Sequence, residues 1–278
     1  MKKFELTTEF ITNFLGTKLF RIKALVEFGK VEKGELGGFV EKEENLDHDG
    51  DAWVSGDAMV YGDARVYGNA WVSGDAWVSG NAWVYGNAMV YGDAWVSGDA
   101  WVYGNAWVYG NAMVYGDARV YGNAWVYGNA WVSGDAWVSG DARVYGNARV
   151  YGNAWVYGDA MVYGDARVYG NAWVYGDAMV YGDARVSGDA RVSGDARVYG
   201  DQMYATVKGF GSEYRNTTFF ITKDGNVCVN CGCFSGTLEQ FREKVEETHK
   251  DTKYAKEYLM IADLMEMHFK EELEKIKK

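Results

Sequence analysis

Three cysteines lie close together near the C-terminal end of the sequence, at Cys228, Cys231 and Cys233. Structural zinc binds thiolates, but its sites usually combine four ligands, often as two C-x₂-C pairs. This run offers three thiols, and nothing in the sequence places His249 beside them as a fourth ligand. We therefore interpret the cysteines as unligated thiols in a strand and turn, with zinc binding as the less favoured alternative.

Histidine is the usual general base near neutral pH. The three histidines, His48, His249 and His268, all lie outside the repeated segment that forms the middle of the chain. None of them is positioned to activate a hydroxyl or an amine. We therefore predict no catalytic residue and no cofactor, and we interpret His268, which lies at helical spacing among apolar residues, as a core residue.

The aromatic residues offer a third kind of chemistry, which is stacking. All twelve tryptophans lie between residues 50 and 199. A long exposed aromatic stripe usually marks an interface, because soluble proteins rarely leave large apolar patches uncovered. The candidate interaction surface consists of Trp71, Trp77, Trp83, Trp95, Trp101, Trp107, Trp125, Trp131, Trp137, Trp155 and Trp173.

These tryptophans belong to a six-residue unit that repeats twenty-five times, without an insertion, from Gly50 to Tyr199. The unit reads Gly, Asp or Asn, Ala, a variable residue, Val, and Tyr or Ser; the variable residue is Trp, Arg or Met. Ala and Val are two positions apart, so a strand places both on one face and the variable residue on the other. Gly, with Asp or Asn, suits a sharp bend. Each unit is therefore predicted to form a short strand and a corner, and the chain must coil.

The spacing resembles the hexapeptide repeat of left-handed parallel β-helices, as found in uncharacterised bacterial or phage proteins of the acyltransferase-like superfamily. In the run from Val54 to Met59, an aliphatic residue is followed four positions later by the small Ala58. The resemblance implies an all-β solenoid of about eight coils with three units per coil. Equivalent residues such as Trp71, Met89 and Trp107 would then form ladders. A flattened coil of two units per turn is the alternative that periodicity leaves open.

Acyltransferases with this repeat typically use a histidine base and a loop that leaves the coil to enclose an acyl-carrier cofactor. The array here contains neither a histidine nor an insertion. We therefore predict that the protein is not an enzyme. Acyl transfer is kept as an alternative, because a fold alone neither implies nor excludes an activity.

The sequence divides into an N-terminal cap at residues 1–49, the solenoid at 50–199 and a small α+β domain at 200–278. In the cap we expect a helix that begins after Thr7 or Thr8 and ends near Phe14, followed by a strand at residues 19–25. Residues 34–46 are interpreted as an irregular first coil, since a solenoid needs its open sheet ends covered.

The C-terminal domain is expected to contain three strands and two helices. The strands are predicted at residues 204–208, 217–222 and 227–231, with a hairpin turn between the last two. Thr237 and Gln240 fit a capping box that starts the first helix, and the second helix follows Asp251 or Thr252.

Composition limits the partners and the compartment. The net charge is −11 and no segment is basic, so we predict no nucleic-acid binding. No apolar run is long enough to span a membrane, and we see no signal peptide in the N-terminal residues. An odd number of closely spaced cysteines argues against a secreted disulfide framework. We therefore expect a cytoplasmic protein.

From these features we predict a non-catalytic scaffold, a rigid β-solenoid that associates with itself into a homo-oligomer through its aromatic faces. The alternative from another class is a sponge-like protein whose Trp and Tyr faces bind a small planar or sugar ligand.

Overall fold

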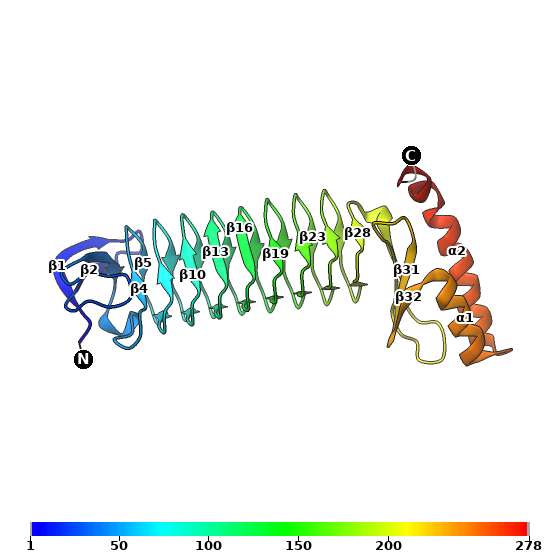
Figure 1. The fold of residues 1–278 in the computed structure, drawn as a ribbon, viewed down its shortest axis with the longest axis horizontal. Coiled ribbons are helices and arrows are strands. Elements are labelled where there is room, and N and C mark those ends of the chain that lie inside the picture. The colour runs from blue at the N-terminus through cyan, green and yellow to red at the C-terminus, as the bar shows by residue number, and fades with distance from the viewer. Residues whose placement is uncertain (1, 277–278) are drawn as a thin grey trace.

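The computed structural model describes residues 2–276. The molecule is elongated: the cap, a straight solenoid and the C-terminal domain follow one another along its long axis (Figure 1). In the solenoid, each strand pairs in parallel with the strand three units later, as Trp71 does with Met89 and Met89 with Trp107. The coil of three units is therefore confirmed, and the coil of two units is wrong.

The solenoid has three faces, each of which we name after one of its tryptophans. The Trp71 face contains β4 (Trp53–Val54), β7 (Trp71–Val72), β10 (Met89–Tyr91), β13 (Trp107–Gly110), β16 (Trp125–Gly128), β19 (Arg143–Val144), β22 (Met161–Val162), β25 (Met179–Val180) and β28 (Arg197–Val198). The Trp77 face contains β5 (Met59–Val60), β8 (Trp77–Val78), β11 (Trp95–Val96), β14 (Met113–Val114), β17 (Trp131–Val132), β20 (Arg149–Val150), β23 (Arg167–Val168) and β26 (Arg185–Val186). The Trp83 face contains β6 (Arg65–Val66), β9 (Trp83–Val84), β12 (Trp101–Val102), β15 (Arg119–Val120), β18 (Trp137–Val138), β21 (Trp155–Val156), β24 (Trp173–Val174) and β27 (Arg191–Val192). Together with the coil that the cap begins, these strands form about nine turns.

The interior of the solenoid is filled by Ala and Val. Both are fully buried in every unit of the array, as Ala94 and Val96 show. The variable residue and the Tyr or Ser point outward, as the period of two predicts. Very short strands can therefore form a continuous dry core, because each coil covers the one before it.

Glycine is required at the corners for two reasons. Gly98 has a φ of +71°, which other residues rarely adopt. A Cβ atom at Gly98 would also lie 2.9 Å from the backbone nitrogen of Gly116 in the next coil. The corners can therefore stack at strand spacing only while they lack side chains.

The Asn or Asp that follows each corner glycine can form hydrogen-bonded ladders along the corners. Asn87 donates from Nδ2 to Oδ1 of Asn105 at 3.0 Å, and Asn105 donates in the same way to Asn123 at 3.0 Å. Asn123 then donates to a carboxylate oxygen of Asp141 at 2.9 Å. The ladder runs in one direction because an amide both accepts and donates, whereas a carboxylate only accepts.

The N-terminal cap is a β-hairpin with a third strand, and the predicted helix after Thr7 or Thr8 is wrong. Its strands are β1 (Phe4–Thr12), β2 (Lys18–Ala24) and β3 (Leu36–Val40). β1 pairs antiparallel with β2, so Gly16, with a φ of +83°, turns a hairpin rather than ending a helix. The strand predicted at residues 19–25 is confirmed.

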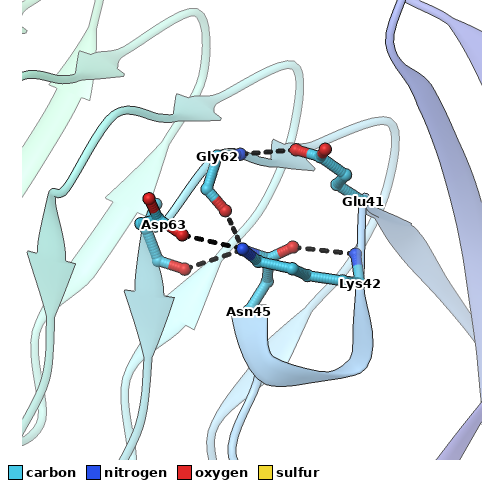
Figure 2. A network of polar contacts seen from close by, with 6 residues as sticks. Glu41, Lys42, Asn45, Gly62 and Asp63 are labelled. Atoms are coloured by element: carbon cyan, nitrogen blue, oxygen red, sulfur yellow. Dashed lines mark hydrogen bonds and ion pairs between the residues drawn. The ribbon is translucent and has the colours of Figure 1, made fainter.

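Residues 36–46 form the coil that precedes the array, as predicted. β3 pairs in parallel with β5, and a short 3₁₀ helix, η1 (Glu43–Asn45), follows. Figure 2 shows how Asn45 closes the first sheet edge: its Nδ2 donates to the carbonyl oxygens of Gly62 and Ala64 at 3.0 and 2.8 Å. The Glu41 carboxylate accepts from the Gly62 amide at 2.7 Å. The side chains of Glu41 and Asn45 thus make hydrogen bonds to backbone groups that have no preceding strand to pair with.

The C-terminal domain consists of a four-stranded antiparallel sheet and two helices. Its elements are η2 (Asp201–Met203), β29 (Tyr204–Val207), β30 (Thr217–Ile221), β31 (Val227–Cys231), β32 (Phe234–Thr237), α1 (Leu238–His249) and α2 (Lys253–Ile276). The predicted strands, hairpin and capping box at Thr237 are confirmed. The helices lie on the side of the sheet that faces away from the solenoid (Figure 1). Neither α1 nor α2 is long and apolar enough to cross a membrane.

This domain closes the other end of the solenoid. Asn230 donates from Nδ2 to the Arg191 carbonyl at 2.8 Å, and the Arg191 amide donates to Oγ1 of Thr218 at 2.9 Å. The Asp201 carboxylate accepts from the Arg185 amide at 2.8 Å. Both ends of the solenoid therefore have backbone groups satisfied by side chains, which protects these edges from pairing with strands of other chains.

Candidate interaction surface

The Trp83 face carries an unbroken column of seven stacked side chains. Adjacent tryptophan rings are nearly parallel, with centres 5.3 Å apart for Trp83 and Trp101 and 4.7 Å apart for Trp137 and Trp155. Arg119 lies between the two tryptophan segments, and Arg191 ends the column. In chain order the members are Trp83, Trp101, Arg119, Trp137, Trp155, Trp173 and Arg191. The spacing follows from the distance between coils.

Tyrosines form a second kind of column beside the tryptophans. On the Trp71 face the stacked rings begin at Tyr91 and Tyr109, whose centres are 4.9 Å apart, and end at Tyr181. Where the next coil carries a tryptophan, the tyrosine meets its ring edge to face, as Tyr91 does with Trp107 at 6.2 Å and 75° and Tyr109 with Trp125 at 6.4 Å and 73°. These contacts leave the ladder tyrosines partly buried, and burial raises the pKa of Tyr109.

The Trp77 face carries the most exposed aromatic patch on the solenoid. Trp95 is 41% exposed and stacks on Trp77, with ring centres 4.7 Å apart. The tip of the cap hairpin extends over this face, where Phe14 stacks on Trp77 at 5.5 Å. Phe14 and Leu15 are themselves 68% and 66% exposed. These four residues, Phe14, Leu15, Trp77 and Trp95, form what we call the hairpin patch.

The other half of the Trp77 face is cationic. Arg149, Arg167 and Arg185 follow one another in successive coils, in register. Arg149 also lies 4.7 Å from the ring centre of Trp131. No arginine of the array forms an ion pair within residues 2–276. The face is therefore aromatic at one end and cationic at the other.

The Trp71 face is less regular than the other two. Trp107 and Trp125 stack at 5.1 Å, and Arg143 lies over Trp125. Trp71 packs partly against the core. Trp53, which begins this face, is fully buried beneath the cap, where Phe28 packs edge-on at 5.4 Å.

The predicted ladders are confirmed on all three faces: each of the eleven candidate tryptophans pairs in register with its predicted neighbours. Sequence reasoning missed Phe14 and Leu15, because it placed Phe14 at the end of a helix. The signal that could have found them is Gly16, which suits a hairpin turn as well as a helix end.

The repeat spacing, the three-unit coil and the outward ladders can be compared with known repeat families. The family model of the YdcK β-solenoid repeat matches residues 64–80, 82–98, 106–122, 112–128, 118–134, 124–140, 142–158, 154–170, 160–176, 172–188, 184–200 and 190–203. Over these residues the array is similar to the YdcK β-solenoid repeat. No curated protein matches the sequence. The cap and most of the C-terminal domain lie outside the matched YdcK repeats.

A large cavity lies where the cap meets the first repeats of the array, with a volume of about 640 Å³. It is lined by Glu43, Glu44, Leu46, Asp47, His48, Arg65, Val66, Tyr67 and Trp83. Nδ1 of His48 accepts the Lys3 backbone N–H at 3.2 Å, so the ring proton is on Nε2, which donates to Glu43 at 2.7 Å. This hydrogen bond holds the pKa of the Glu43 carboxyl below its usual range. Because both ring nitrogens are engaged, His48 has no free lone pair to act as a general base.

The three cysteines do not converge on one point. Cys228 and Cys231 are three positions apart on β31, so their side chains lie on opposite faces of the strand. Cys231 accepts a hydrogen bond from Oγ1 of Thr217 at 3.2 Å, and burial raises the pKa of the Cys228 thiol. Within residues 2–276, no group of three or more His, Cys, Asp or Glu side chains is arranged to bind a metal ion.

The remaining histidines belong to the helices. The His249 ring packs beside Tyr254 and Tyr258. His268 is exposed, so its interpretation as a core residue is wrong. The buried stripe of α2 consists of Ala255, Tyr258, Ile261, Ala262, Met265 and Phe269, and position 268 lies beside this stripe rather than within it.

Proposed function

We propose that the protein is a non-catalytic scaffold that forms homo-oligomers through the Trp77 face. The observation that supports this proposal is the division of that face into an aromatic half and a cationic half, with arginines that have no carboxylate partner in the described part of the chain. We also propose that the coil is left-handed, as in the β-helices that the repeat resembles, and that the protein acts in the cytoplasm.

The division favours an antiparallel arrangement of two copies. A two-fold axis between Met113 and Trp131 would place Trp95 of one copy opposite Arg149 of the other, because ladder residues recur every eighteen positions on both chains. The same axis places Trp77 opposite Arg167. Each copy would then supply both halves of a self-complementary contact, as a two-fold interface requires.

A parallel arrangement is unfavourable, because it would place the arginine column of one copy on that of the other. In the antiparallel arrangement, the arginines of each copy would instead meet the outward edges of the other copy's tryptophans, whose ring faces are stacked within the column, and would pack their apolar stems against those edges. Two pairs per copy, doubled by symmetry, give four such contacts. The apolar hairpin patch would be covered at the same time, which removes exposed hydrophobic area from water.

The experiment measures mass in solution by light scattering, for the wild type and for variants of the face. The wild type is expected to exceed the chain mass of 31.1 kDa. Trp95→Arg should lower the mass, since the introduced guanidinium would meet Arg149 of the other copy, and the double variant Trp95→Arg/Arg149→Trp should restore it. The matched control is Trp155→Arg, which interrupts a stack on the Trp83 face and should leave the mass unchanged. A wild type of 31.1 kDa at every concentration, or equal effects of Trp95→Arg and Trp155→Arg, would overturn the proposal.

The cavity at the cap favours a second candidate function, the binding of a small sugar-like ligand. Its wall combines the rings of Trp83 and Tyr67 with the carboxylates of Glu43, Glu44 and Asp47. Aromatic faces bind the apolar side of a sugar, and carboxylates accept hydrogen bonds from its hydroxyls. Titration with neutral oligosaccharides should change the tryptophan fluorescence of the wild type but not that of Trp83→Phe. A response that survives in Trp83→Phe would place the ligand elsewhere.

Acyl transfer has less support than either candidate. The engaged nitrogens of His48 leave no histidine base in the cavity beside the array, and His268 is exposed on α2. Acyl transfer at this cavity would therefore need a base other than histidine.

A further inference from the structure

The last helix carries an apolar stripe that nothing else in residues 2–276 covers. Met260, Leu264 and Met267 are 71%, 49% and 67% exposed, which is unusual for large hydrophobic residues. Their spacing of four and then three residues places them one above the other on one face of α2. The stripe is therefore a continuous ridge on the helix.

This ridge lies opposite the face by which α2 is held. The buried residues of α2, such as Tyr258, Met265 and Phe269, pack into the core of the C-terminal domain. At 100° per residue, the middle of that buried face lies about 160° from the ridge. Because the helices lie beyond the small sheet, away from the solenoid, the ridge faces outward at the end of the molecule (Figure 1).

Charged residues continue the ridge at both ends, with opposite signs. Lys253 and Lys256 lie before Met260 on the same face, and Glu271 and Glu274 lie after Met267. All four side chains are exposed. The ridge is thus cationic at the start of α2, apolar in the middle and anionic at the end.

We propose that this ridge docks against the same ridge of a second copy, with the two α2 helices antiparallel. A two-fold axis beside Leu264 places Met260 opposite Met267, and it places Lys256 opposite Glu271 and Lys253 opposite Glu274. A parallel pair would bring Lys against Lys and Glu against Glu. Charge complementarity therefore selects both the partner, a second copy, and its direction.

The contact is separate from the Trp77 face and joins two molecules by their C-terminal ends. The buried area of a single helix pair is small, so the dimer is expected to be reversible and dependent on concentration. The solenoids of the two copies would point away from the shared pair of helices.

The test uses the full chain in the Trp95→Arg background, in which the Trp77 face is already disabled. Light scattering should give twice the chain mass of 31.1 kDa at high concentration. Lys256→Glu should reduce the mass to that of one chain, because the introduced carboxylate would meet Glu271, and Lys256→Glu/Glu271→Lys should restore the dimer. The matched control, Lys244→Glu, changes an exposed lysine of α1 and should leave the dimer intact.

Three results would overturn this proposal and would leave the proposed self-association through the Trp77 face unaffected. The first is a Trp95→Arg chain that stays at 31.1 kDa at every concentration. The second is a dimer that is insensitive to Lys256→Glu. The third is a double charge exchange that fails to restore the dimer while circular dichroism shows an unchanged fold. If Trp95→Arg does not lower the wild-type mass, the same charge exchange is made in the wild-type chain, and it tests the ridge alone.

Discussion

The guanidinium carbon of Arg119 lies 4.9 Å from the centre of the Trp137 ring. On its other side it lies 5.2 Å from Trp101. An arginine therefore occupies a tryptophan's place in the column without interrupting it, because a planar cation stacks on aromatic rings. The variable position of the repeat can thus change the charge of a face while the coil beneath it stays the same.

Removing Arg119 tests whether the column contributes to stability. Arg119→Ala should lower the free energy of unfolding by about 1–2 kcal/mol, since it removes two cation–π contacts of about 0.5–1 kcal/mol each. Equilibrium unfolding in urea measures this change. Arg65→Ala is the control, because Arg65 is an exposed arginine of the same face for which no cation–π contact is found in the described structure. Equal losses in the two variants would mean that stacking adds nothing.

The array could be predicted from the sequence because each unit contacts only its neighbours. The corner Gly92 and the inward Ala94 and Val96 belong to one unit, so a pattern of six residues is enough to predict the fold of the array. The cap could not be predicted in this way. β1 is a strand because it pairs with β2, and a local signal such as Thr7 at a candidate N-cap says nothing about that distant partner.

The corner glycines offer a second prediction, with a control supplied by the chain. Gly98 and Gly188 both have positive φ, at +71° and +66°, so alanine is strained at either position. A Cβ at Gly98 would meet the backbone of Gly116, whereas nothing lies within 4 Å of a Cβ at Gly188. Gly188→Ala should cost about 1–2 kcal/mol, the ordinary penalty of the left-handed region. Gly98→Ala should cost more, and urea unfolding of both variants measures the difference. Equal costs would contradict a steric role for the stacked corners.

The direction of the asparagine ladder gives a third prediction. Asn105→Asp can still accept from Asn87 but cannot donate to Asn123, so it should destabilise the protein by about 1 kcal/mol. Asp141→Asn, at the end of the same ladder, keeps the acceptor for Asn123 and should be tolerated. Thermal unfolding of the two variants measures this asymmetry. A loss of stability in Asp141→Asn as large as that in Asn105→Asp would show that the ladder has no direction.

The candidate surface could be predicted only in part. Rings whose neighbours belong to the repeat could be placed from the sequence, whereas rings whose neighbours belong to the cap could not. The ladder from Trp83 to Trp101 follows from the repeat alone. The burial of Trp53 and the stacking of Phe14 on Trp77 depend instead on how the cap folds over the first coils. The same limit applies to α2: helical spacing predicts its buried face, but only the structure shows that the face with Met260 is left uncovered.

The two proposed contacts have different two-fold axes. One would lie on the Trp77 face between Met113 and Trp131, and the other beside Leu264 on α2. Two distinct two-fold contacts on one chain would join dimers into a larger assembly, whose closure depends on the angle between the two axes. The masses of single-face variants would then stop at the dimer, whereas the mass of the wild type would exceed that of the dimer.

The tyrosine ladders predict how stability depends on pH. Burial within the stack, together with the neighbouring Tyr85, raises the pKa of Tyr67 from 10.0 to about 12. Burial also raises the pKa of Tyr85 and Tyr103 in the same ladder. In the unfolded chain these phenols ionise near pH 10, while in the folded chain they keep their protons to higher pH. The ladder's contribution to stability is therefore complete below pH 10 and is lost as the pH rises toward 12.

Absorbance titration measures the ionisation of the tyrosines, and urea unfolding at each pH measures the stability of the fold. The folded protein should show its ladder tyrosines ionising later than tyrosine in unfolded protein, and the unfolding midpoint should fall over the same pH range. Tyr67→Phe keeps the stacked ring but removes one titrating group, so its midpoint should fall less steeply than that of the wild type. Tyr214→Phe is the control, because Tyr214 is an exposed tyrosine of the C-terminal domain. If Tyr67→Phe and Tyr214→Phe changed the slope equally, protonation within the ladder would not be coupled to folding.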